Sequence, residues 1–108
     1  MNIILIVDNK NKTAQLYRAG LEAYVGAEVV EINNIDEATE YIFHHAPNIV
    51  ITRSPIQERD IGYKFHVLIK EKQLESKLII LGKSKVTQYD ATLFSDDVEV
   101  REVIRTCA

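Results

Sequence analysis

The sequence predicts an α/β protein with a doubly wound, five-stranded parallel sheet that helices cover on both faces. Strand-like and helix-like patterns alternate five times along the 108 residues. Most strand-like runs are continuously apolar rather than alternating, which is typical of strands buried on both faces. Because right-handed crossovers join consecutive parallel strands, the helices between them must pack against the two faces of one sheet.

Residues 2–26 contain the first strand and the first helix. The run NIILIVD at 2–8 is continuously apolar up to its final aspartate, as a central strand requires. The segment that follows has apolar residues at helical spacing, and Gly26 is a natural helix stop. The apolar positions of this helix are Ala14, Tyr17, Leu21, Tyr24 and Val25.

The second strand and helix are shorter. AEVVEI at 27–32 is the strand. The helix at 33–45 begins at Asn34, three residues before Glu37, which is the spacing of a capping box. One face of this helix carries Ala38, Tyr41, Ile42 and His45.

The third strand, PNIVIT at 47–52, runs into a loop that begins with Arg53. A helix at 61–76 follows, with Ile61, Phe65, Leu68 and Ile69 on its apolar face. Glu58 and Asp60 lie in the intervening loop, where we expect a solvated charge cluster.

The last two strands are KLIILG at 77–82 and ATLFS at 91–95. The nine residues at 82–90 leave room for roughly two helical turns, so the fourth helix is expected to be short or missing. A final helix at 96–108 is expected to be capped by one of its two leading aspartates, Asp96 or Asp97. Its apolar stripe is Val100, Val103, Ile104 and Cys107.

Composition and charge limit the function classes. Thirteen Lys and Arg against sixteen Asp and Glu give a net charge of −3, without a dense basic run for nucleic acid or an anionic membrane. The single cysteine, Cys107, cannot form an internal disulfide, and the N-terminal apolar run is too short to span a membrane. No metal-ligand spacing is present, so we expect no metal, and we expect no other cofactor. The length of 108 residues predicts one domain over 1–108, and the single cysteine favours a cytoplasmic protein.

The ordered set of motifs resembles the receiver domain of bacterial response regulators, which has the CheY-like fold. The matching segments are ILIVDN at 4–9, NIDEATEYI at 34–42, PNIVITR at 47–53, DIG at 60–62 and KLIIL at 77–81. The resemblance covers nearly the whole chain and implies the strand order 2-1-3-4-5. It also implies two-component signalling, with the chain as the N-terminal part of a longer signalling protein.

Receivers of this kind accept a phosphoryl group from a histidine kinase on an aspartate that ends strand three. Two acids after strand one help to bind Mg²⁺, while a hydroxyl residue after strand four and a lysine after strand five contact the phosphate. At the matching positions this sequence has Asp8, Asn9, Arg53, Gly82 and Ser95 or Asp96. Arg53 is the residue at the acceptor position, and an arginine has no nucleophilic oxygen. The resemblance therefore implies a degenerate phosphorylation pocket with no catalytic residue, in a protein that is not an enzyme.

Two environments are open for Arg53. It is either a solvated loop residue or the partner of Asp8, since strands one and three are neighbours in this fold. Ser84 could still supply a hydroxyl if the register after strand four is shifted.

The leading functional hypothesis is a non-phosphorylatable receiver-like module that binds protein, as a homodimer or by regulating an attached or separate output domain. A regular final helix cannot turn all four of its candidate interface residues to the core, so an apolar contact patch is expected there. These residues are Val98, Val100, Val103 and Ile104.

Two alternatives stay open. One is an atypical receiver that is phosphorylated at a substitute residue such as Ser54 or Asp60. The other is a flavodoxin-like domain that binds a small anion at the strand ends through Arg53, Lys83 and the nearby asparagines.

Overall fold

A five-stranded parallel sheet forms the centre of the molecule, in the order β2-β1-β3-β4-β5. The computed structural model describes residues 2–9 and 12–108. The strands are β1 (Asn2–Val7), β2 (Ala27–Ile32), β3 (Ile49–Ser54), β4 (Lys77–Gly82) and β5 (Thr92–Phe94). All four strand pairs are parallel, so the predicted fold class and strand order are confirmed.

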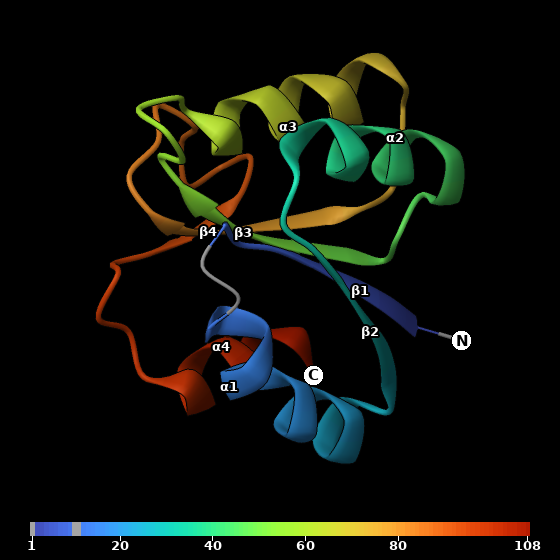
Figure 1. Cartoon of the computed structure of the whole chain (residues 1–108), viewed down its shortest axis with the longest axis vertical. Coiled ribbons are helices and arrows are strands. Elements are labelled where there is room, and N and C mark those ends of the chain that lie inside the picture. Colours follow the sequence, from blue (N-terminus) through green and yellow to red (C-terminus); the bar gives the residue numbers. More distant parts are fainter. Residues whose placement is uncertain (1, 10–11) are drawn as a thin grey trace.

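Helices cover both faces of this sheet (Figure 1). One face carries α2 (Ile35–His45) and α3 (Ile61–Glu71), and the other carries α1 (Lys12–Gly20) and α4 (Val100–Cys107). A π-helical turn, η1 (Leu21–Val25), continues α1. None of the helices in the described part of the chain is long and apolar enough to cross a membrane.

Alternate residues of β1, an interior strand, point into two separate cores. Ile4 and Ile6 of β1 belong to the core shared with α1 and α4, and Leu5 and Val7 belong to the core shared with α2 and α3. Both sets are fully buried. The continuous apolar run of the first strand follows from this arrangement, because each of its faces is covered.

The first helix departs from its predicted pattern at its end. Ala14, Tyr17 and Leu21 are buried as expected, but the side chain of Tyr24 is 81% exposed. The cause is the π-helical turn, whose wider winding rotates Tyr24 off the apolar stripe. Gly26 ends the helix in the left-handed conformation, with φ of 69°, as the sequence predicts.

No helix lies between β4 and β5. Residues 83–91 form turns and irregular backbone. The fourth helix, which the short spacing predicts to be short or missing, is therefore missing. The helix labelled α4 is therefore the final helix of the sequence prediction.

That final helix begins at Val100, later than predicted. Glu99 occupies its N-cap position without a side-chain cap, so the prediction that Asp96 or Asp97 caps the helix is wrong. A turn closed by the Val98 amide and the Ser95 carbonyl (3.1 Å) intervenes, and both aspartates bind elsewhere.

The four predicted interface residues all contact the core. Val103 is fully buried, and Val98, Val100 and Ile104 are partly buried against the same core. The expected apolar contact patch assumes that Val98 belongs to the final helix. Val98 instead precedes α4, so the helical spacing does not prevent it from packing against the core with the other three residues. Ile104 also lies where a Cβ on Gly20 would stand, 2.3 Å from its Cδ1 atom. These four residues therefore do not form the exposed apolar patch that the sequence predicts. Binding of a protein partner at this surface stays a prediction.

Cys107 is a small core residue at the end of α4. Burial raises the pKa of its thiol to about 11, against a smaller opposing effect of the Lys77 charge. At pH 8 only about one molecule in a thousand then carries the reactive thiolate. We expect a maleimide to modify the folded protein at least about 100-fold more slowly than the urea-unfolded protein. Equal rates in the two states would contradict this burial.

Candidate functional site

The carboxyl ends of β1, β3, β4 and β5 meet at one edge of the sheet, where the sequence predicts the site. Strand β3 has the predicted length of six residues but begins and ends two residues later than predicted, so Arg53 and Ser54 lie in the strand and pair with Leu81 and Gly82. The prediction that Arg53 begins a loop is wrong, because the β3–β4 ladder continues through Ser54, whose carbonyl also accepts a bond from the Lys83 amide (2.8 Å). Asp8 follows β1 directly and is buried.

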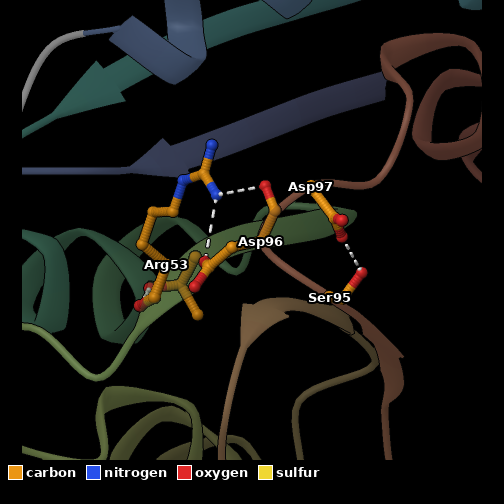
Figure 2. Close-up of polar contacts among 5 residues, drawn as sticks. Arg53, Ser95, Asp96 and Asp97 are labelled. Atoms are coloured by element: carbon orange, nitrogen blue, oxygen red, sulfur yellow. Dashed lines mark hydrogen bonds and ion pairs between the residues drawn. The ribbon is translucent and has the colours of Figure 1, made fainter.

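Arg53 forms an ion pair with Asp96, which follows β5 (Figure 2). The Nη1 atom of Arg53 lies 3.2 Å from the Oδ1 atom of Asp96 and 3.4 Å from its backbone oxygen. The Arg53 side chain is 26% exposed and that of Asp96 is 75% exposed. Arg53 is thus not simply solvated, since a carboxylate that follows the edge strand β5 contacts it. Its pairing with Asp8 stays a prediction.

Gly82 is required by its surroundings. Its φ of +124° is rarely adopted by residues with a side chain, and a Cβ at this position would lie 2.0 Å from the Ser54 carbonyl oxygen. The same Cβ would lie 3.1 Å from Oδ1 of Asp96. The backbone of β3 and the carboxylate of Asp96 therefore fill the space that a side chain would need here.

Asp60 joins three segments near the same edge. Its Oδ1 atom accepts hydrogen bonds from the Ser54 hydroxyl (3.1 Å) and the Tyr63 amide (3.0 Å), and its Oδ2 atom accepts one from the Lys85 amide (2.8 Å). The hydroxyl of Ser84 is a fourth donor. Asp60 is thus the N-cap of α3 and a link between β3 and the β4–β5 loop.

The pKa of Asp60 reflects these bonds. Burial raises it, but the hydrogen bonds from Ser84, Lys85, Tyr63 and Ser54 together bring it below its ordinary value. The prediction of a solvated charge cluster is wrong for Asp60. An aspartate directly before an apolar helical run is a recognised capping signal, and it could have identified this role.

The other predicted pocket residues lie apart from the Arg53–Asp96 pair. The hydroxyl of Ser95 donates to Oδ1 of Asp97, as Figure 2 also shows. Asn9 is exposed and lines a separate polar cleft of about 150 Å³ together with Asn33, Asn34 and Arg59. Asp8, Arg53 and Gly82 thus lie at the carboxyl ends of their strands, whereas Asn9 lines another cleft and Ser95 bonds to Asp97. That these residues form one degenerate pocket stays a prediction.

Comparison with known proteins identifies the fold. No protein-family model and no curated protein matches the chain. Among solved structures, a signal receiver domain from Vibrio parahaemolyticus superimposes with a TM-score of 0.82 at 13% identity, covering 97% of this chain and 85% of that one. The chain has the CheY-like receiver fold.

Two further structures support this receiver fold. The receiver domain of the Francisella response regulator 1452 gives a TM-score of 0.79 at 15% identity, with 99% of this chain and 93% of that chain covered. A CheY-like response regulator receiver domain protein from Methanospirillum hungatei JF-1 gives 0.78 at 18% identity, with coverage of 98% and 90%.

The ion pair joins the end of β3 to the residue two positions after β5. The receiver resemblance implies an aspartate at the first of these places and a lysine at the place of Ser95 or Asp96. If that correspondence holds at Asp96, the positive and the negative charge have exchanged places.

A receiver's Mg²⁺ does not fit the residues at this edge. A hard cation needs several oxygen ligands, yet Asn9 lines a different cleft and Arg53 brings a positive charge to the acceptor position. Within residues 2–9 and 12–108, no group of three or more His, Cys, Asp or Glu side chains could hold a metal ion.

The strength of the Arg53–Asp96 pair can be measured by a double-mutant cycle with alanine. Because Asp96 is largely exposed, we expect a coupling free energy of about 0.5 kcal/mol from urea unfolding. Exchanging the charges, with Arg53→Asp and Asp96→Arg together, should recover stability that Arg53→Asp alone loses. A double exchange no more stable than Arg53→Asp would show that the pair does not interact in solution.

Proposed function

We propose that this receiver-fold chain is a signalling module that does not accept phosphate and acts by binding protein. The observation that carries the proposal is the Arg53–Asp96 pair, which puts a guanidinium where a phosphoacceptor aspartate is needed. The partner is a second copy of the chain or an output domain, and the module is a cytoplasmic binding protein rather than an enzyme.

The pair supplies internally what a receiver obtains from phosphorylation. In a phosphorylated receiver, a cation after strand five contacts negative charge that has been added at strand three. Here two side chains of the protein itself, Arg53 and Asp96, form the contact between a cation and an anion across the strand ends. This contact therefore needs no phosphodonor. Such a pair favours one fixed arrangement of the β5–α4 segment.

The surroundings of Ser54 and Asp60 argue against phosphorylation at a substitute residue. Ser54 is 3% exposed, and its hydroxyl both donates to Asp60 and accepts from the Gly62 amide (3.2 Å). Asp60 already accepts four hydrogen bonds, so attack on a phosphodonor would require breaking several of them. For the alternative of an anion site, the Asp96 carboxylate competes for Arg53.

Radiolabelled acetyl phosphate with Mg²⁺ tests the proposal. We expect no label on the wild-type chain and no change in its melting temperature with beryllofluoride. The variants Ser54→Ala and Asp60→Asn locate the acceptor if label appears. Stable incorporation of label, or saturable beryllofluoride binding by the wild type, would refute the loss of phosphate chemistry.

A further inference from the structure

A groove of about 390 Å³ runs along α2, beside the end of β2. Its apolar lining includes Ile32 from β2 and Tyr41 from α2, both partly buried. Three carboxylates from the exposed side of α2 stand around it: Asp36, Glu37 and Glu40. No lysine or arginine of the described chain lines this groove, but His44 does, and its Nε2 atom lies 3.1 Å from Oε2 of Glu40. An apolar floor with an acidic rim is thus open to solvent.

We propose that this groove binds a basic amphipathic helix of a partner protein. The inference deepens the proposed function and rests on it, since it names the surface and the chemistry of a protein partner. Apolar side chains of such a helix would cover Ile32 and Tyr41, while its lysines and arginines would lie beside Asp36, Glu37 and Glu40. Helices commonly bind in grooves in this manner.

Charge favours this occupant over a second copy. The chain has a net charge of −3, so two copies repel each other weakly at long range. Burial raises the pKa of Tyr41, and the nearby charge of Glu28 raises it further, so Glu28 adds to the negative potential at this part of the groove. A basic segment from another protein meets complementary charge on several sides.

The β2 edge is less suited to binding an added strand. The guanidinium of Arg18 donates to the Val29 carbonyl of β2 (3.0 Å) and lies 3.9 Å from Glu31, so it already engages this strand. At the other end of the groove, His45 stacks on Tyr41 with ring centroids 4.2 Å apart, which holds the aromatic floor in place. The first contact occupies part of the β2 edge, and the second fixes one wall of the groove on α2.

The test uses an 18-residue fluorescent peptide of leucine and lysine with helical amphipathic spacing. Two control peptides are a lysine–leucine scramble without that spacing and a glutamate–leucine version. The groove variant is Glu37→Gln with Glu40→Gln, and its matched control is Glu58→Gln with Glu75→Gln, which removes the same charge from exposed positions elsewhere. Fluorescence anisotropy gives the affinity, and amide NMR shifts locate the peptide.

We expect the amphipathic basic peptide to shift amides of residues 28–45, and the groove variant to weaken binding about fivefold. The control variant should stay within about twofold of wild type. Equal weakening in both variants, equal binding of the scramble, or shifts outside this segment would overturn the proposal. Concentration-dependent shifts of the same residues without peptide would assign the groove to a second copy instead and also overturn it.

Failure here and failure of the proposed function are distinguishable. The groove shares no residue with the Arg53–Asp96 pair, so a negative peptide result leaves the phosphodonor result standing. Phosphate label on the wild-type chain would likewise refute the proposed function while the peptide data still report on the groove.

Discussion

Replacing Gly82 with serine is expected to lower the free energy of unfolding by about 3–5 kcal/mol, which is enough to unfold a domain of ordinary stability. Two effects add. The φ of +124° strains any residue with a side chain, and the new Cβ would stand 2.0 Å from the Ser54 carbonyl oxygen. Backbone of a central strand cannot move aside as a flexible side chain would.

The matched control is Gly26→Ser. Gly26 also has positive φ, at +69°, but a Cβ there meets no atom within 4 Å. This variant should lose only about 1 kcal/mol. Urea unfolding followed by circular dichroism measures both, and similar losses for the two variants would contradict the steric argument at Gly82.

The Gly82 prediction also bears on the receiver resemblance. Serine at this position would return the hydroxyl that receivers carry after strand four, so sequence comparison alone would rank the change as restorative. The structure predicts the opposite, because Gly82 is part of a close approach between β3, β4 and Asp96.

Replacing Asp60 with alanine is expected to lower the free energy of unfolding by about 2–4 kcal/mol. The change removes the N-cap of α3 and leaves four donors without their acceptor, among them the buried hydroxyl of Ser54. Glu58→Ala, two residues away and exposed, should stay within about 0.5 kcal/mol of wild type. If the two variants unfold at the same urea concentration, Asp60 does not hold these segments together.

Asp60 also predicts a pH dependence. Its pKa is lowered in the folded state, so the carboxylate contributes stability that is present above the unfolded-state pKa. This contribution should be lost as the pH falls from about 4 through the folded-state pKa. Asp60→Asn should be less stable at pH 7 and should lack this part of the acid loss. A parallel acid profile for the two proteins would contradict the assignment.

The fold could be predicted in most of its elements, because its signals are local. The strands at 27–32 and 77–82 have the predicted bounds. The side chain of Asn34 accepts the Glu37 amide (3.0 Å) and starts α2 where the capping pattern indicates. Strand ends were less predictable, since the extension of β3 to Ser54 depends on its ladder with β4.

The candidate site could be located but not assembled from sequence. The resemblance placed Arg53 at the end of strand three, yet its contact with Asp96 joins residues 43 positions apart. That contact depends on the turn at residues 95–98 before α4, whereas the apolar spacing predicts a helix that begins at residue 96. The capping role of Asp60 has a local sequence signal, but its bonds to Ser54, Ser84 and Lys85 have none, because those donors come from other segments of the chain.

The absence of a helix between β4 and β5 has a consequence for local opening. Strand β5 has three residues and, among residues 2–9 and 12–108, pairs with β4 alone, so few backbone hydrogen bonds hold it. Short edge elements open at free energies below that of global unfolding. The Arg53–Asp96 ion pair adds a side-chain contact between the segment that follows β5 and the central strand β3. Its loss should register first as faster amide exchange in residues 92–94, before any fall in melting temperature.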